Sequence, residues 1–188
     1  MTDNAQKMKE LYEKASIKTE ILHQGARTSS ILSIIDFGNG HIKKYQSLSH
    51  HGAVAIVAQD EKFIYFVKQY RHTVRKIVLE LPAGLIELNE TQDQAAIREL
   101  EEEIGKKPNH LKYIQSVLTS PGILHEEIHL YYAHGLIDSK KLGDDTHEID
   151  IIKIPIEETL SDHFISQLLD AKTIIGLNWL KNHVKKNH

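Results

Sequence analysis

The first fifty residues alternate between short apolar runs and turn residues, a pattern typical of a small antiparallel sheet. The polar start of the chain, Met1 to about Ser16, has the character of a short helix. Isoleucine and threonine enrichment predicts strands over Lys18–Gln24 and Arg27–Asp36, and a turn at Gly38–Gly40 predicts a partner strand over His41–Leu48. This meander has few large core residues, so we expect it to dock on the rest of the chain or on a second copy.

Longer apolar runs follow and predict the main domain. Two of them are separated by polar turn residues and predict a core hairpin, Ala53–Ala58 and Phe63–Gln69. The remaining elements expected are a helix at Thr91–Ile104, strands near Leu111–Leu118, Ile128–Ala133 and Ile149–Ile154, and C-terminal helical segments at Glu157–Leu169 and Thr173–Asn182. The order is mixed α/β and lacks the βαβ regularity of a doubly wound sheet.

Composition narrows the class of protein. Hydrophobic residues make up 40% and charged residues 26% of the 188 residues, which predicts a sizeable core under a polar surface. The net charge of -3 argues against a nucleic-acid partner, because such binding depends on neutralising phosphates. The absence of cysteine excludes disulfides and thiolate metal sites. No apolar signal region and no run near the ~20 residues of a membrane helix is present, so we expect a cytoplasmic protein.

The helix expected at Thr91–Ile104 has a defined start and end. Thr91 and Gln94 form a capping box, and Gly105 suits the left-handed position after a helix. Four residues can bury one face: Ala95, Ala96, Leu100 and Ile104. Another face carries three carboxylates, at Glu99, Glu102 and Glu103. Clustering like charges costs on the order of a few tenths of a kcal/mol per pair.

An acidic helix face is usually only a solvated surface, but this one has a second feature beside it. A glycine loop is expected at Ala83-Gly84-Leu85, before the helix, and it lets bare backbone approach a metal or a phosphate. Converging carboxylates also suit hard divalent cations such as Mg²⁺. The combination favours a metal-dependent site over a solvated face.

The spacing of these residues matches a known motif. The segment reads Gly84-x5-Glu90-x7-Arg98-Glu99-Leu100-x-Glu102-Glu103-x-Gly105, and it resembles the Nudix box at every charged and glycine position. The final position, normally aliphatic, is Lys106, which affects packing rather than metal binding. Three flanking segments resemble the ADP-ribose pyrophosphatase branch: Gln69-Tyr70-Arg71, Glu80-Leu81-Pro82-Ala83-Gly84 and Ser120-Pro121-Gly122-x-x-x-Glu126.

The resemblance implies an α/β (α+β) Nudix fold, in which a mixed sheet lies between helices. Residues 1–48 are then the N-terminal helix and antiparallel β meander, and residues 49–188 the hydrolase domain. Because related enzymes commonly exchange the N-terminal sheet across a homodimer, a dimer is expected. The implied activity is the hydrolysis of ADP-ribose to AMP and ribose 5-phosphate, with two or more Mg²⁺ ions, or Mn²⁺ in their place.

The resemblance also implies roles for individual residues. The metal ligands expected are the Ala83 carbonyl with Glu99 and Glu103, and Glu102 is a further ligand or supports the others. Arg71 is expected to hold a phosphate, Leu85 to supply a backbone contact and Glu126 to face the substrate. The branch often has a base in an Asp-Glu-x-Glu stretch. Here the stretch is Asp145-Thr146-His147-Glu148, so Glu148 is the expected catalytic base and His147 a weaker candidate.

Other functions remain open at this point. His125-Glu126-Glu127-Ile128-His129 matches the His-Glu-x-x-His signature of zinc proteases, which requires a helix. The β-rich residues that follow favour a strand instead. A pyrophosphatase for another nucleoside diphosphate sugar or a dinucleotide is the main alternative. A non-catalytic Nudix-fold binding module is a remote one: such domains sometimes keep the fold and lose the glutamates, whereas Glu99, Glu102 and Glu103 are intact here.

Overall fold

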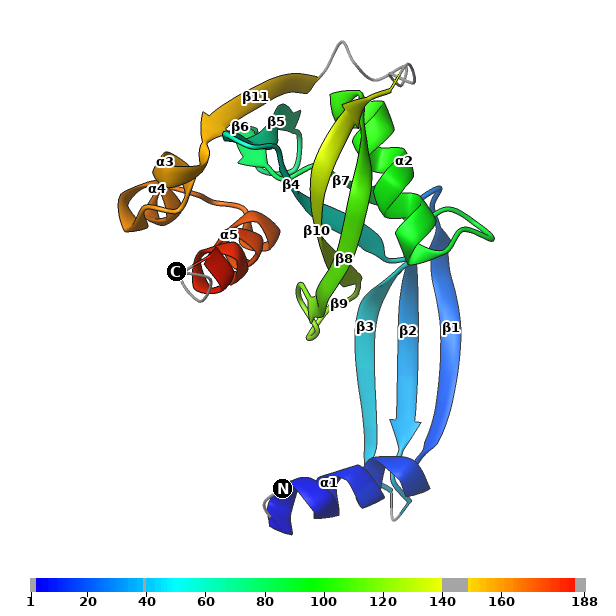
Figure 1. Cartoon of the computed structure of the whole chain (residues 1–188). Helices are drawn as coiled ribbons and strands as arrows, with labels where there is room; N and C mark the ends of the chain where they lie inside the picture. The colour runs from blue at the N-terminus through cyan, green and yellow to red at the C-terminus, as the bar shows by residue number, and fades with distance from the viewer. Residues whose placement is uncertain (1–2, 39, 140–148, 185–188) are drawn as a thin grey trace. The chain divides into compact units, whose positions relative to one another are not determined.

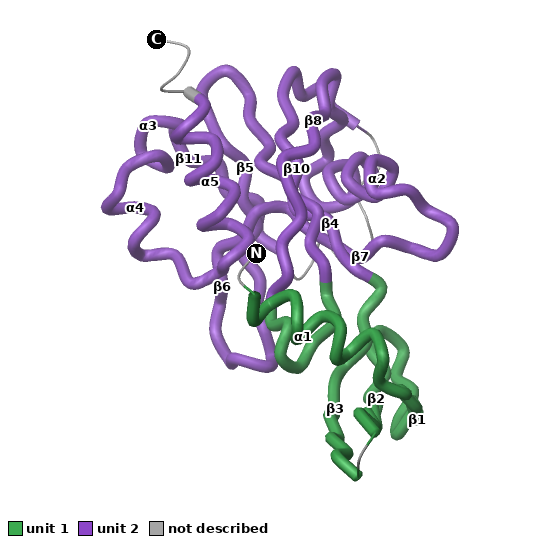
Figure 2. The backbone as a smooth tube through the Cα atoms, turned by 90° about the horizontal axis from the view of Figure 1, so that it is seen from below, with its two compact units in different colours: residues 1–51, 120–126 green, residues 52–119, 127–188 purple. Residues whose placement is uncertain are grey.

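The structure is a computed structural model that describes residues 3–38, 40–139 and 149–184. Its contacts divide the chain into two compact units, which Figure 2 draws in different colours. Unit 1 comprises residues 1–51 and 120–126, and unit 2 comprises residues 52–119 and 127–188. Unit 1 therefore takes a short segment from the middle of the chain.

Unit 1 is a helix followed by a four-stranded sheet in the order β1-β2-β3-β9. Its elements are α1 (Asp3–Lys14), β1 (Ser16–Gln24), β2 (Thr28–Asp36), β3 (Ile42–His50) and β9 (Leu124–His125). The predicted helix and antiparallel meander are confirmed, and Gly38 turns the chain with a φ of 80°. The sequence did not predict β9, a two-residue strand parallel to β3.

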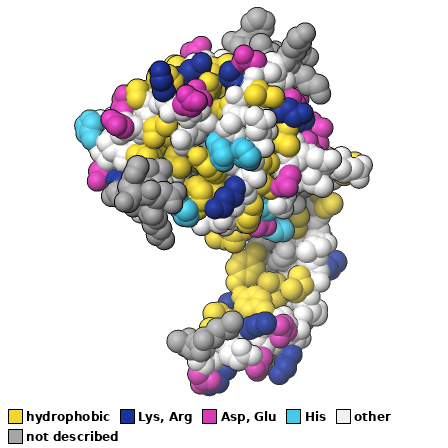
Figure 3. Space-filling model, viewed as in Figure 1, with side chains coloured by type: hydrophobic (Ala, Val, Ile, Leu, Met, Phe, Trp, Pro, Cys, Tyr) yellow, Lys and Arg dark blue, Asp and Glu magenta, His cyan; other side chains and the backbone are white. Residues whose placement is uncertain are grey.

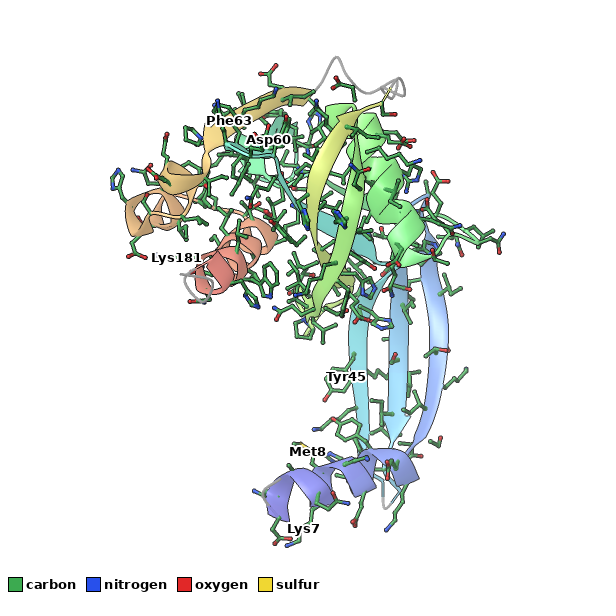
Figure 4. All side chains as sticks on the ribbon, in the orientation of Figure 1. Lys7, Met8, Tyr45, Asp60, Phe63 and Lys181 are labelled. Carbon is green, nitrogen blue, oxygen red and sulfur yellow. The ribbon has the colours of Figure 1, made fainter. Side chains whose placement is uncertain are left out.

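Unit 1 buries little apolar surface. Within its described residues, Ile35 is the one hydrophobic side chain in the buried core. Figure 3 shows hydrophobic side chains gathered over β3 and beside α1, and Figure 4 labels two of them, Met8 and Tyr45. The exposed large apolar residues of this unit are Met8, Leu11, Ile17, Ile21, Leu22, Ile42, Tyr45, Leu48 and Ile123. Such a surface is larger than isolated exposed side chains would give.

Unit 2 is built on a mixed sheet in the order β11-β5-β4-β10-β8. The strands are β4 (Ala53–Gln59), β5 (Phe63–Arg71), β6 (Lys76–Glu80), β7 (Ala83–Leu85), β8 (Lys106–Leu118), β10 (Glu127–Asp138) and β11 (Ile149–Pro155). The pairing of β10 with β4 is parallel, whereas β8 and β11 pair antiparallel with their neighbours. Two short strands extend the sheet, because β6 pairs with β5 and β7 pairs with β4.

Helices cover both faces of this sheet, as Figure 1 shows for α2 (Gln92–Ile104) and α5 (Ala171–Val184). Alternate residues of β4 divide between the two faces, as the two-residue repeat of a strand requires. Val54 and Ile56 pack in one cluster with α2, while Val57 packs in another with residues of α5. The mixed sheet between helices is therefore confirmed. Within the described ranges, each helix is too short or too polar to cross a lipid bilayer.

Three predictions for unit 2 were wrong in detail. The continuous helix over Glu157–Leu169 is two short helices, α3 (Ile156–Thr159) and α4 (Asp162–Ser166), because the Ser161 side chain caps a new helix by accepting a hydrogen bond from the Phe164 amide at 3.1 Å. Strand β8 begins at Lys106, directly after α2, rather than near Leu111. The glycine segment Ala83–Leu85 is strand β7 rather than a loop, because it pairs with Ala53–Ala55.

Candidate active site

Helix α2 carries the candidate glutamates, and both of its ends follow the predicted signals. The Thr91 side chain accepts a hydrogen bond from the Gln94 amide at 3.3 Å, and the Gln94 side chain accepts one from the Thr91 amide at 2.9 Å. Gly105 ends the helix with a φ of 63°. The predicted apolar face is buried through Ala95, Ala96, Leu100 and Ile104. The buried face therefore fixes the orientation of the helix about its own axis.

Arg98 connects most of the acidic groups of this site. It donates to both carboxylate oxygens of Glu90, at 2.8 and 2.9 Å, and to the Leu85 carbonyl at 2.7 Å. Its Nη1 atom donates to Glu99 at 2.7 Å and to Glu102 at 2.9 Å. The hydrogen bonds from Arg98 lower the pKa of Glu90. One guanidinium thus reduces the repulsion among three carboxylates and orients them.

Glu99 lies directly against the backbone of Gly84. A Cβ atom built on Gly84 would stand 2.0 Å from Glu99 Oε1, so no residue with a side chain fits there without moving the carboxylate. The Glu99 residue is only 7% exposed. Burial raises the pKa of this carboxyl, and the opposing interaction with Arg98 does not overcome that effect. The glycine is needed here for close approach rather than for a turn.

Glu103 reaches the residue before that glycine. Its Oε2 atom accepts a hydrogen bond from the Ala83 amide at 2.9 Å. Burial raises the pKa of Glu103 to about 8, and the negative charge of Glu99 adds to this rise. Without a cation, much of this side chain is therefore protonated near neutral pH.

The donor atoms at this point suit a hard divalent cation. Glu99 and Glu103 offer carboxylate oxygens, Ala83 offers a carbonyl, and cysteine thiolates are absent from the sequence. A cation would also remove the cost of two buried carboxylates in close proximity. Within the described residues, no three His, Cys, Asp or Glu side chains are already arranged around one metal position. Backbone oxygens or water can complete the coordination.

Arg71, the expected phosphate ligand, is anchored by a buried carboxylate. Its Nε and Nη2 atoms donate to the two oxygens of Glu80 at 2.6 and 2.7 Å. Burial favours protonation of Glu80, but the hydrogen bonds from Arg71 and Lys172 outweigh it and lower its pKa. The Arg71 side chain is 41% exposed, against 3% for Glu80. Glu80 therefore holds one edge of the Arg71 guanidinium, and the side chain remains accessible to an anion.

Two other predicted residues lie in different surroundings. The Leu85 carbonyl accepts from Arg98, so its observed backbone contact is with the protein itself. Glu126 belongs to unit 1, where its Oε1 lies 3.5 Å from His50 Nδ1. Glu148, the expected base, and His147 lie outside the described residues.

The protease signature is not supported by its surroundings. His125 lies in β9 and His129 in β10, so the segment does not form the helix that this mechanism requires. His129 is 8% exposed, and its two ring nitrogens hydrogen bond with Ser116 at 2.7 Å and Gln92 at 3.1 Å. Both nitrogens thus have structural partners.

Sequence reasoning did not assign roles to Glu80 or Lys172. Glu80 does carry a signal, because it is a charged residue at the end of an apolar run, directly before Leu81-Pro82-Ala83-Gly84. Such a residue is buried only when it is paired. Lys172 has no comparable signal, since its contact with Glu80 joins residues 92 positions apart.

A mixed sheet between helices, with a capped glutamate helix lying against a glycine strand, defines a hydrolase fold known from other proteins. The family model described as the NUDIX domain matches residues 49–170. The chain belongs to the Nudix family and is a Nudix hydrolase, an enzyme of small nucleotide substrates. Nudix hydrolases generally depend on a divalent metal.

Similar proteins cover nearly the whole chain. An ADP-ribose pyrophosphatase of Bacillus subtilis (strain 168) is 32% identical over 177 residues, which are 93% of this chain and 95% of that protein. A methanol dehydrogenase activator of Bacillus methanolicus is 34% identical over 177 residues, which are 93% of this chain and 96% of that protein. The crystal structure of an ADP compounds hydrolase matches with a TM-score of 0.77 and 21% identity, covering 93% of this chain and 96% of its own. This last likeness concerns the fold alone.

Proposed function

We propose that the protein hydrolyses the diphosphate bond of ADP-ribose, giving AMP and ribose 5-phosphate. The observation that carries this proposal is the convergence of Glu99 and Glu103 on residues 83–84. Beside them lies Arg71, a partly exposed arginine that is held by the buried carboxylate of Glu80. The similarity to an ADP-ribose pyrophosphatase across 93% of the chain supports the choice of substrate. A second ADP-ribose pyrophosphatase, from Mycobacterium tuberculosis, is 32% identical over 166 residues.

In this proposal the residues divide between metal and substrate. The Ala83 carbonyl, Glu99 and Glu103 hold the cofactor, with Glu102 beside them, and the cofactor is two or more Mg²⁺ ions, with Mn²⁺ as the alternative. When bound, these ions neutralise the diphosphate and lower the pKa of water. Arg98 keeps Glu99 and Glu102 in place through the hydrogen bonds described above.

The remaining proposed roles concern the substrate and the proton. Arg71 binds a phosphate and stabilises negative charge as the bridging oxygen leaves. Leu85 provides backbone contact, and Glu126 faces the substrate. Glu148 accepts the proton of the attacking water as the new phosphorus–oxygen bond forms and the bond to the bridging oxygen breaks.

Product analysis tests the substrate. The purified chain is incubated with Mg²⁺ and each member of a panel of ADP-ribose, other nucleoside diphosphate sugars and dinucleotides. We expect AMP and ribose 5-phosphate in equal amounts, and the highest kcat/KM for ADP-ribose. A higher kcat/KM for another compound would replace ADP-ribose with the alternative substrate, while no turnover of any member would favour a binding module.

The relative named for methanol dehydrogenase activation provides a second candidate. Its 34% identity over 93% of the chain is comparable to that of the pyrophosphatases. The same preparation is therefore added to a methanol dehydrogenase assay, with Glu103→Gln as a control. Stimulation that depends on Glu103 would favour this role, and unchanged dehydrogenase activity would exclude it.

We also propose that the protein is a homodimer in which the unit 1 meander helps to form the partner's substrate pocket. Unit 1 buries one large aliphatic side chain but exposes several others, including Ile21 at 64%. A second copy would cover this surface, and two-fold symmetry would complete both sites together. A sheet of this size needs a packed hydrophobic face for independent stability, and the described residues of unit 1 bury one hydrophobic side chain.

A charged substitution in the meander tests the dimer. Light scattering should show a dimer for the wild type and a monomer for Ile21→Glu, with a raised KM for ADP-ribose. Ile77→Glu is the matched control, because Ile77 is 69% exposed but lies in unit 2. A wild-type monomer, or a dissociated Ile21→Glu variant with unchanged KM, would contradict the proposal.

A further inference from the structure

The proposed phosphate ligand Arg71 belongs to an ion cluster in unit 2 whose other members have no role in the reaction described above. Its centre is Glu80, whose side chain is 3% exposed. Arg71 donates to both Glu80 oxygens, and Lys172 donates to Glu80 Oε2 as well. The Lys172 side chain is 10% exposed and also contacts Asp170 Oδ1 at 3.0 Å. Two cations and two anions thus balance in a small volume.

The same cluster fixes the start of α5 to Leu81, which lies between β6 and β7 and precedes the proposed metal site. Asp170 Oδ2 accepts hydrogen bonds from the Thr173 hydroxyl at 2.6 Å and from the Thr173 amide at 3.0 Å. The Thr173 oxygen in turn accepts from the Leu81 amide at 2.8 Å. Lys172 therefore has little freedom to move away from Glu80.

This arrangement has an electrostatic consequence for Arg71. If a buried carboxylate had a single cation beside it, its negative charge would cancel most of the electrostatic potential of that cation. Few water molecules are present there to stabilise the carboxylate instead. Lys172 supplies a second cation to the same carboxylate. Its positive charge also acts on the neighbouring Glu103, whose pKa it lowers against the larger effect of burial. The charge of Lys172 therefore extends to the site itself.

We propose that Lys172 is a positioning residue that sets the affinity of the Arg71 phosphate site. By neutralising Glu80 from the other side, it leaves the charge of Arg71 available to a diphosphate. This inference rests on the proposed role of Arg71 in phosphate binding, and it adds a residue of α5 that does not touch the substrate.

Two substitutions in the cluster have opposite predicted signs. Lys172→Met removes a positive charge, so it should raise both the KM for ADP-ribose and the Kd for pyrophosphate with Mg²⁺ about tenfold, equivalent to about 1.4 kcal/mol. Its kcat should change by less than about threefold. Asp170→Asn removes a negative charge, while its amide oxygen can still accept from Thr173, so binding should stay equal or tighten. Lys172→Arg keeps the positive charge, so its KM for ADP-ribose and its Kd for pyrophosphate should remain within about threefold of the wild-type values.

The control is Lys181→Met, which removes a lysine from the same helix. Lys181, labelled in Figure 4, pairs with Asp162 at 2.5 Å, and that aspartate is 98% exposed. This variant should bind like the wild type. Calorimetry with magnesium pyrophosphate and steady-state kinetics are measured on each variant, after thermal unfolding has established that it is folded.

The outcomes separate this inference from the proposed function. Weaker binding in both Lys172→Met and Asp170→Asn would indicate a purely structural cluster and overturn the inference. Unchanged binding in Lys172→Met, or no pyrophosphate binding by the wild type, would also overturn it. If Lys172→Met does not fold, Asp170→Asn decides: pyrophosphate binding equal to or tighter than that of the wild type supports the inference, and weaker binding overturns it. Pyrophosphate has no nucleoside, so its binding does not depend on the choice of substrate. If the variants show the expected Kd values for pyrophosphate but the wild type does not hydrolyse ADP-ribose, the proposed substrate is contradicted and the inference about Lys172 stands.

Discussion

The contact between Gly84 and Glu99 allows a test of the site with a single methyl group. In Gly84→Ala, the new Cβ atom would stand 2.0 Å from Glu99 Oε1, 2.1 Å from Cδ and 2.3 Å from Oε2. The carboxylate must retreat by about 1.4 Å to reach an ordinary van der Waals contact. Gly84 is not among the positive-φ glycines, so alanine fits its backbone conformation. The predicted effect is therefore local to Glu99.

The same geometry separates the effect on stability from the effect on activity. The displaced atoms are the end of a flexible side chain, so overpacking should cost only about 1 kcal/mol, or a Tm decrease of about 2–4 °C. A ligand displaced by about 1 Å can reduce the rate by about 100-fold. We therefore expect kcat/KM for ADP-ribose to fall by about two orders of magnitude, with a higher Mg²⁺ concentration for half-maximal activity.

The assay is a Mg²⁺ titration of initial rates, with thermal unfolding measured on the same preparations. Gly122→Ala is the matched control, because a Cβ atom at Gly122 would meet nothing within 4 Å. We expect the control to differ little from the wild type in either measurement. Wild-type turnover and Mg²⁺ dependence in Gly84→Ala would refute the reasoning that Glu99 must occupy this position.

Three further predictions concern the same unit. Glu103→Gln should keep the fold but lose at least about 100-fold in kcat, because a neutral amide is a poorer metal ligand; wild-type kcat under saturating Mg²⁺ would contradict its role. The pKa of about 8 for Glu103 means that the metal-free fold binds an extra proton between the carboxyl's ordinary pKa and 8, so its stability should fall as pH rises over this range. Metal affinity should rise over the same range, and calorimetry in buffers of different ionisation enthalpy should show proton release that Glu103→Gln abolishes. His129→Gln should retain metal-dependent hydrolysis, and joint loss of activity and of stoichiometric zinc would restore the protease interpretation.

The parts of the fold that could be predicted from sequence depend on local signals. Helix α2 was predicted with its ends because Thr91, Gln94 and Gly105 act within one or two turns of the helix. The carboxylates of Glu99 and Glu103 were predicted to lie together for the same reason, since their spacing alone places them on one side of a helix. Caps and helical spacing need no knowledge of the rest of the fold.

The parts that were missed depend on tertiary contacts or on competing signals. The break between α3 and α4 was missed because apolar spacing continues through Ser161, whose capping role is evident only once the chain is folded. The pairing of Glu80 with Lys172 joins positions 92 residues apart, and no pattern in a single sequence identifies it. Strand β7 was read as a loop because its three residues are too few for a periodic pattern.

The segment from residue 80 to residue 85 explains how one short stretch can link the two halves of the proposed site. Along the sequence, the residues at the start of this segment contact the proposed phosphate site, and the residues at its end contact the proposed metal site. The contacts join Glu80 to Arg71 and Lys172, the Leu81 amide to Thr173, the Ala83 amide to Glu103, the Gly84 backbone to Glu99, and the Leu85 carbonyl to Arg98. A displacement of this segment would therefore move the arginine and the carboxylates together. The distance between phosphate and metal ligands is then set by one continuous segment, made of the end of β6, Leu81 and Pro82, and β7, rather than by separate loops. Such a fixed spacing suits a diphosphate, whose length is also fixed.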